Sequence, residues 1–478
     1  MPALKNKAAP GQGTQLSVKQ ALMLAGIAAL YFIIMFALPT PAGLTWDGKK
    51  AIALMTCLIL SLATQVVPML ISAVVFMFLA YVAGINTEVG IVKDFASPVL
   101  FFLMASILLA MAMESSGLSK RLALQMSVLS KGKPNALLFY IMLGTCIVGV
   151  FINNLSTCAA FLPIVLAICE KNKLPRGKSN FAKALMIGII FGSMISGNAT
   201  PAGSSMNVMG LNLLRNLTGM TLSFAKWSTL GFPIVILTLP VLWLIVVLVF
   251  PPEIKEIAGM EDMKKDLAAL GRLNGQEIKF LVIVAAMVFA WFTQGILHDF
   301  STSTISVFFA TLFFFPGIGL LKIEHTNKIN WSVIIITGVS FAFGSAMFNT
   351  GASGWLANVS LMPFANAHPL LLVFIIGTFT TLLQVLIPSC PACVSILVPT
   401  VAAFAAETGL SPMLLYLPVA FTVSACWLLP FDPLPLLCLP ENYFSLKEYF
   451  KSGWIAHATL IVVTTIVVYF LGRPLGYF

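Results

Sequence analysis

A polar cluster inside an apolar run constrains the fold of this chain more than any other sequence feature. Residues 150–163 read VFINNLSTCAAFLP, and four of the five side chains from Asn153 to Thr157 are polar. Each unsatisfied polar group in hydrocarbon costs several kcal/mol, so this stretch must face protein or water. Residues 385–399 (VLIPSCPACVSILVP) repeat the arrangement. The two stretches predict re-entrant hairpins that hold a solute between their tips.

The composition indicates a membrane protein. The chain has 478 residues, of which 59% are hydrophobic and 9% are charged, whereas a soluble domain is roughly 25% charged. Runs of about 20 apolar residues recur from end to end, and they are continuous rather than alternating, which argues against a transmembrane β-barrel. We predict an all-α polytopic membrane protein with about 11 transmembrane helices plus the two re-entrant hairpins.

The charge distribution predicts the topology. With the N-terminus in the cytoplasm, 21 of the 27 Lys and Arg residues fall in cytoplasmic segments, which agrees with the positive-inside rule. The C-terminus is then on the outer side of the membrane, which we expect to be the inner membrane of the cell. The net charge of +10 is explained by these cytoplasmic loops and does not indicate nucleic acid as a partner. Four tryptophans near the ends of spans are expected to anchor helices at the interface: Trp46, Trp227, Trp331 and Trp454.

The chain divides into two halves with matching features. In each half a hairpin precedes an interrupted apolar stretch, which Gly and Pro interrupt at 196–205 and Pro interrupts at 430–435. Such pairs are the best sequence indication of a transporter built from inverted repeats, with its site near the midplane. The predicted divisions are a cytoplasmic tail (1–18), a first half (19–250, hairpin 134–168, broken helix 184–214), a cytoplasmic linker (251–279) and a second half (280–478, hairpin 368–403, broken helix 413–439).

Several short motifs follow one another along the chain. The first tip reads Asn153-Asn154-Leu155 and the second reads Ser389-Cys390-Pro391, and each is followed by a proline ten residues after its first residue, Pro163 or Pro399. The other motifs are Glu114–Leu118 (ESSGL) and the two interrupted segments Thr200–Asn207 (TPAGSSMN) and Leu429–Leu436 (LPFDPLPL).

In order and spacing these motifs resemble the divalent anion/sodium symporter family, which carries dicarboxylates, citrate or sulfate. The resemblance extends over most of the chain from about residue 98 onward. It implies a homodimer, a scaffold and a mobile transport domain that works as an elevator, substrate between the two tips, and sodium beside each tip. The chain departs from the family pattern at four positions, where Leu155 and Pro391 stand for threonine, Cys390 for asparagine and Asp432 for alanine.

The candidate site residues are small polar groups at the tips and breaks. Helix N-termini and Asn side chains offer N–H donors to an anion without a fixed charge that would trap it. Ser156 and Thr157 have an alternative, structural role, in which their hydroxyls form hydrogen bonds to the backbone within the hairpin. The alternative role of Asp432 is that of a helix N-cap. The substrate candidates are Asn153, Asn154, Ser156, Thr157, Thr200, Ser204, Asn207, Ser389 and Cys390, and the cation candidates are Asn153, Asn154, Gly203, Ser389 and Asp432.

These features predict a secondary transporter of small divalent anions, such as succinate, malate, fumarate or citrate, driven by cation symport. An exchanger, a proton-coupled carrier and a sulfate or sulfonate permease on the same fold remain alternatives, so the coupling ion is sodium or a proton. The apolar spans contain no nucleophile–base set, and the Cys390–Cys393 pair has no second pair or histidine cluster beside it, so we expect neither an enzyme nor a metal cofactor. The chain has no phosphate-binding G-x-x-x-x-G-K loop.

Overall fold

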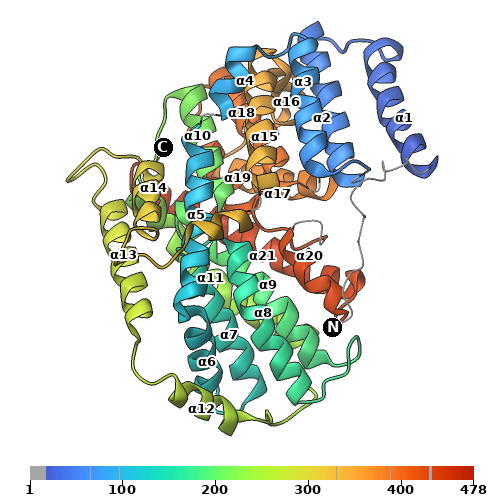
Figure 1. Ribbon diagram of the computed structural model, residues 1–478. Coiled ribbons are helices and arrows are strands. Elements are labelled where there is room, and N and C mark those ends of the chain that lie inside the picture. Colours follow the sequence, from blue (N-terminus) through green and yellow to red (C-terminus); the bar gives the residue numbers. More distant parts are fainter. Residues whose placement is uncertain (1–17, 65, 96, 330, 388, 430–432) are drawn as a thin grey trace.

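The protein is helical, as its composition predicts. The computed structural model describes residues 18–478 except 65, 96, 330, 388 and 430–432, and this part contains helices and one isolated bridge but no strand (Figure 1). Eight of its helices are long and apolar enough to cross a membrane, or nine if the bent pair Ile334–Asn349 and Ala352–Ser360 is one span. Shorter apolar helices accompany them, so the total of about 11 spans stays a prediction.

The first half consists of α1 to α11. Its helices are α1 (Val18–Phe32), α2 (Trp46–Thr64), α3 (Met69–Val82), α4 (Glu88–Phe95), α5 (Pro98–Ser116), α6 (Leu118–Leu129), α7 (Pro134–Gly149), α8 (Asn154–Lys171), α9 (Asn180–Ser196), α10 (Ser205–Thr218) and α11 (Phe224–Val249). A π-helical turn, Ile33–Ala37, extends α1, and a 3₁₀ turn, Pro201–Gly203, lies between α9 and α10.

The second half follows the short helix α12 (Met260–Ala269). Its helices are α13 (Gly275–Phe292), α14 (Thr302–Leu312), α15 (Trp331–Asn349), α16 (Ala352–Ser360), α17 (Pro369–Leu386), α18 (Cys390–Thr408), α19 (Pro412–Thr422), α20 (Pro433–Cys438) and α21 (Leu446–Gly472), with 3₁₀ turns at Ile323–Lys328, Met362–Phe364 and Leu439–Glu441.

Two helix–turn–helix pairs occupy the positions of the predicted hairpins. Helices α7 and α8 form the first pair, joined by the non-helical residues 150–153. Helices α17 and α18 form the second, joined by residues 387–389, of which 388 is not described. Helix α7 has 16 residues, or about 24 Å, which is less than the roughly 30 Å of a bilayer core. Figure 1 shows the first pair in the lower half of the molecule and the second in the upper half.

Two interruptions divide helices near the centre of the molecule. The chain is non-helical or 3₁₀ from Gly197 to Ser204, between α9 and α10, and we call this segment the first break. The second break is the segment from Val423 to the start of α20, of which residues 430–432 are not described. The first break follows the hairpin α7–α8 in the sequence, and the second break follows the hairpin α17–α18.

In each half, the long helix that follows the break carries a glycine where it lies against the break. A Cβ atom at Gly231 of α11 would overlap the carbonyl oxygens of Asn198 and Ala199 in the first break, and one at Gly453 of α21 would overlap the carbonyl oxygen of Trp427 in the second. The two long helices also pack on each other. The glycines therefore occupy equivalent positions in the two halves.

One tryptophan corrects the sequence analysis. Trp227 was expected at the membrane interface, but its side chain is fully buried and its Nε1 donates to the carbonyl oxygen of Asn198 at 2.9 Å. The prediction was wrong because the break, a buried segment with unpaired carbonyls, provides an acceptor for the indole N–H. Trp46, Trp331 and Trp454 are about half exposed.

A buried ion pair connects the two halves at the linker. Arg121 of α6 binds both carboxylate oxygens of Glu277 in α13, at 2.7 and 3.0 Å. Its remaining donors reach the carbonyl oxygens of Leu270, Gly271 and Arg272. Both charged side chains are at least 93% buried, and removing one partner of such a pair costs about 3–5 kcal/mol. The pair therefore fixes α6 against the end of the linker.

The contact between α21 and the second break gives a stability prediction. Gly453→Ala forces a methyl group into the carbonyl of Trp427, and overpacking of this kind costs about 1–3 kcal/mol. We expect a lower apparent melting temperature of the purified protein in detergent. Gly275→Ala is the control, because a Cβ there has nothing within 4 Å. Equal melting temperatures for the two variants would contradict the contact.

Candidate functional site

The tip of the first hairpin is the N-terminus of a helix. Asn153 is the N-cap of α8, and its Oδ1 accepts a hydrogen bond from the backbone N–H of Leu155 at 2.9 Å; Oδ1 of Asn154 lies 3.1 Å from the same N–H. The buried Thr157 donates its hydroxyl to the carbonyl oxygen of Asn153 at 3.2 Å. Thr157 thus makes the bond within the hairpin that was its alternative role, and the tip presents the positive end of a helix dipole.

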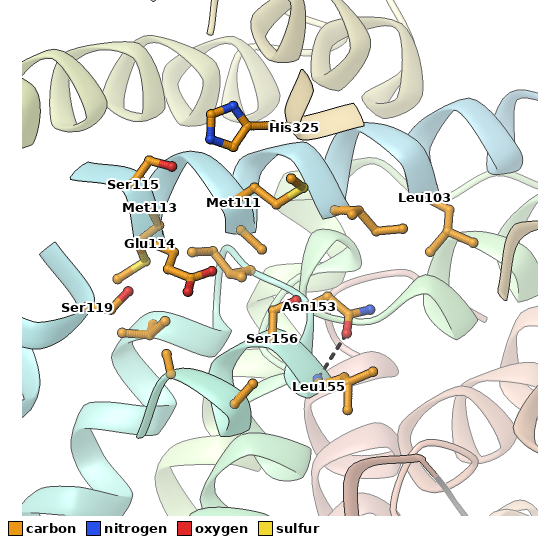
Figure 2. Close-up of a pocket in the computed structure, with 16 residues that line it drawn as sticks. Leu103, Met111, Met113, Glu114, Ser115, Ser119, Asn153, Leu155, Ser156 and His325 are labelled. Atoms are coloured by element: carbon orange, nitrogen blue, oxygen red, sulfur yellow. Dashed lines mark hydrogen bonds between the residues drawn. The ribbon is translucent and has the colours of Figure 1, made fainter. Parts of the chain in front are cut away.

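A cavity of about 580 Å³ opens at this tip. From the hairpin it is lined by Asn153 and Ser156, and from the facing side by Glu114, Ser119 and His325. Figure 2 shows Glu114 across the hollow from Asn153 and Ser156. The cavity therefore has the N-terminal turn of α8 on one wall and a carboxylate on the other.

The first break rests directly on this tip. Thr200 donates its hydroxyl to the carbonyl oxygen of Val150 at 2.6 Å. A Cβ at Gly203 would lie 2.9 Å from Cα of Gly197 and 3.0 Å from the carbonyl oxygen of Gly149, so the three backbones approach closely because they lack side chains. Gly203 is thereby held beside the tip.

Asn207 stabilises the break from inside. Its Nδ2 donates to the carbonyl oxygens of Gly197 at 2.7 Å and of Thr200 at 3.1 Å, and the Thr200 carbonyl also accepts from the backbone N–H of Gly203 at 3.2 Å. The side chain is fully buried, and within the described part of the chain its Oδ1 has no hydrogen-bond partner. Asn207 is therefore both a structural clamp and a source of a buried, available oxygen.

The two breaks contact each other. The hydroxyl oxygens of Ser204 and Ser424 are 3.0 Å apart. Nδ2 of Asn198 also donates, at 2.8 Å, to the carbonyl oxygen of Phe421 in the last turn of α19, just before the second break. Asn198 is 1% exposed, and its Oδ1 has no hydrogen-bond partner among the residues described. Ser204 also accepts from the N–H of Met206 at the start of α10. Both halves thus meet at one polar centre.

The second tip is joined to the second break. Sγ of Cys390 lies 3.2 Å from Sγ of Cys426, and Nε2 of Gln384 donates to the carbonyl oxygen of Val423. Ser389 precedes α18 as its N-cap without a side-chain capping bond. Neither Ser389 nor Cys390 lines the cavity at the first tip. Asp432 lies outside the described residues.

Several polar residues at this centre were not among the sequence candidates. Asn198 and Ser424 lie in the breaks, and Gln384 is a buried amide within the apolar helix α17. Glu114 appeared in the sequence only as the first residue of the motif Glu114–Leu118, and it lines the cavity. A lone amide such as Gln384 in an apolar run was a usable signal. The side-chain partners of Asn198 and Ser424 could not be predicted from the sequence, because Phe421 and Ser204 lie more than 200 residues away from them.

Comparisons with known proteins now identify the family. The family model described as the sodium:sulfate symporter transmembrane region matches residues 19–478. The chain belongs to this family. It is a multi-pass membrane transporter and not an enzyme, as the motifs of the tips and breaks indicated.

Relatives in the sodium:sulfate symporter family extend over almost the whole chain. The chain is 25% identical over 469 residues to a sodium-dependent dicarboxylate transporter SdcS of Staphylococcus saprophyticus, covering 93% of this chain and 90% of that protein. It is 25% identical over 461 residues to a membrane protein of Cupriavidus necator, covering 90% and 88%. A Staphylococcus aureus SdcS transporter is 24% identical over 474 residues, covering 94% and 90%.

A solved structure supports the fold. The YdaH transporter of Alcanivorax borkumensis, whose crystal structure reveals an unusual topology, is similar with a TM-score of 0.52. The match covers 80% of this chain and 88% of the other at 15% sequence identity, so the likeness concerns the fold alone.

The clamp at the first break gives a prediction for this symporter. Asn207→Ala removes the donor of the buried Gly197 carbonyl and one of the two donors of the Thr200 carbonyl, which keeps the backbone N–H of Gly203. A buried group left unsatisfied costs about 1–3 kcal/mol, so we expect a clear fall in melting temperature. Asn212→Ala, five residues further along α10, removes only a bond to the carbonyl oxygen of Val208 in the same helix, and should change stability little. A smaller loss for Asn207→Ala than for Asn212→Ala would exclude the clamp.

Proposed function

We propose that this protein is a sodium-coupled symporter of small dicarboxylates, of the class of succinate, malate, fumarate or citrate. The observation that carries the proposal is the cavity at the first tip, in which the N-terminus of α8 and the side chains of Asn153 and Ser156 face the carboxylate of Glu114. The substrate class comes from relatives that are sodium-dependent dicarboxylate transporters along nearly their whole length.

The hairpin side of the cavity suits a carboxylate. The first N–H groups of α8 carry about half a positive charge in sum, and Asn153 adds a side-chain amide with two N–H donors. Such dipoles bind an anion without the desolvation cost of a buried lysine or arginine. Asn154, Thr200 and Ser204 are proposed to support the same group from the tip and the first break.

The carboxylate of Glu114 favours entry of the anion together with cations. A dianion alone would be repelled by Glu114 across the cavity, whereas a dianion accompanied by sodium would not. Oxygen ligands for sodium are available at the first break, where Gly203 lies against the carbonyl of Gly149. The buried amide oxygens of Asn198 and Asn207 have no hydrogen-bond partner among the described residues. Unwound backbone of this kind coordinates sodium in other transporters.

The mechanism and setting form the remaining part of the proposal. We propose an elevator in which the two hairpins and two breaks move together against a scaffold, in a homodimer of the inner membrane with a cytoplasmic N-terminus and an external C-terminus. The direct bonds from the first break to the second break and to α19 support a single moving unit, because Ser204–Ser424 and Asn198–Phe421 would have to break if the halves moved separately. Substrate is proposed to bind between the two tips, with Ser389 and Cys390 contributing from the second.

Coupling to protons, or exchange of anions, is the second candidate. It is favoured by two departures from the family pattern: Cys390 at the second tip offers a sulfur in place of the family's amide oxygen, and Asp432 adds a titratable carboxyl to the motif Leu429–Leu436. A sulfate or sulfonate permease shares the same site chemistry. These alternatives differ from the main proposal in the ion and the anion that drive uptake.

Uptake in reconstituted vesicles tests the function. We expect radiolabelled succinate to accumulate under an inward sodium gradient and not under a potassium gradient, with malate, fumarate and citrate competing better than sulfate. Asn153→Ala should raise the half-saturating succinate concentration roughly ten- to a hundredfold, because hydrogen bonds to charged groups contribute about 1.5–3 kcal/mol. Sodium-independent uptake would favour the second candidate, and sulfate as the preferred anion would favour the permease.

Asn135→Ala provides the matched control for this assay. Asn135 is exposed and lies at the opposite end of the same hairpin, so its removal should leave the half-saturating concentration unchanged. If both variants impaired uptake equally, the loss would reflect damage to the hairpin and not the removal of a ligand from its tip.

The carboxyl of Asp432 gives a separate prediction. Asp432→Asn keeps the shape of the side chain and removes its charge, so we expect the dependence of uptake on pH or on cation concentration to change. The measurement is succinate uptake in vesicles across a pH series and a sodium series. An unaltered dependence in both series would remove Asp432 from the coupling mechanism.

A further inference from the structure

Four of the eight cysteines form two close pairs between distant elements. Sγ of Cys390, the first residue of α18, lies 3.2 Å from Sγ of Cys426 in the second break. Sγ of Cys158 in α8 lies 3.6 Å from Sγ of Cys438 at the end of α20. Each pair connects the second helix of one hairpin to the segment 426–438. All four side chains carry thiols and not disulfides.

The two pairs differ in their exposure. Cys158 and Cys438 are both 0% exposed, so a reagent in solution has no route to either sulfur. Cys390 is 6% exposed. All eight cysteines lie in the described part of the chain, and Cys426 alone among them is half-buried, whereas the other seven are buried. Only the pair at the second tip therefore has an accessible member.

We propose that Cys390 and Cys426 are an oxidative modification site, at which a small disulfide compound cross-links the tip of the second hairpin to the second break. The S–S bond of a disulfide is about 2.05 Å long, so the two sulfurs need to approach by little more than about 1 Å. Such a short movement lies within the side-chain torsions of two cysteines.

The chemistry is thiol–disulfide exchange in two steps. The thiolate of Cys426 attacks one sulfur of the small disulfide, and one small thiol leaves with the proton that Cys426 gave up. The sulfur of Cys390 then attacks the sulfur of Cys426, the mixed disulfide breaks, and the second small thiol leaves with the proton of Cys390. The two protein thiols lose two electrons, which reduce the small disulfide to two thiols.

The cross-link would hold the second tip against the break. Ser389 and Cys390 belong to the proposed binding site, so a consequence for uptake rests on the proposed function: the oxidised protein transports less, and a reducing agent restores it. The cross-link itself does not depend on that function. Fragment analysis therefore tests the modification site even if the transported anion is different.

Cleavage at methionine separates the possible cross-links. Cyanogen bromide releases residues 363–413, which contain Cys390 and Cys393, and residues 414–478, which contain Cys426 and Cys438; Cys158 falls in fragment 143–186. The purified protein is treated with 4,4′-dithiodipyridine, its remaining thiols are alkylated, and it is cleaved without reduction. We expect fragments 363–413 and 414–478 to stay joined and to separate after reduction.

Three variants identify the sulfurs. Cys426→Ser should leave the fragments 363–413 and 414–478 separate, whereas Cys438→Ser and Cys393→Ser should leave them joined. Fragments that stay separate in the oxidised wild type would overturn the proposal, as would fragment 143–186 joined to 414–478, or cross-linking that survives Cys426→Ser. In the same samples uptake should fall in proportion to the joined fraction and be insensitive to oxidation in Cys426→Ser.

Discussion

Backbone groups that leave helical pairing inside a membrane protein need partners, and this requirement organises the centre of the structure. Lipid offers no hydrogen bonds, so non-helical backbone persists only where protein or a watery cavity satisfies it. In the first break Asn207 supplies donors to two carbonyls, and Trp227 supplies one to Asn198. In the second break Gln384 does the same for Val423. The breaks are thus held by side chains from neighbouring helices.

The same requirement explains the small residues around the breaks. Gly231 and Gly453 allow α11 and α21 to lie against carbonyls of the two breaks, and Gly149 and Gly203 allow the first tip to lie on the first break. A side chain at any of these positions would overlap its neighbours and push the packed segments apart. The glycines therefore bring the N-terminus of α8, the break and the cavity into one place, which is what an anion site built on helix dipoles needs.

How far the site can be predicted depends on the kind of residue. Asn153 and Ser156 were recognisable because adjacent polar groups in an apolar run have to face something other than lipid, and both line the cavity. Thr157 followed its alternative role and bonds the backbone. Glu114 and Asn198 were missed as site residues, because a carboxylate at a helix end and an amide in a glycine-rich break have local explanations that require no distant partner. The prediction that Trp227 lies at the membrane interface was wrong for a similar reason, because its position near the end of a span did not reveal its partner Asn198.

The sequence by itself determined the class of the protein, its helical architecture, and the family to which its tip and break motifs belong. Periodicity, hydropathy and short motifs are local properties, and local properties are written in consecutive residues. The tertiary structure alone decided that Ser204 faces Ser424, that Arg121 closes on Glu277, and that Cys390 and Cys158 each lie against a second thiol. These pairs join residues from 36 to 280 positions apart, and only the packing of the helices brings them within reach.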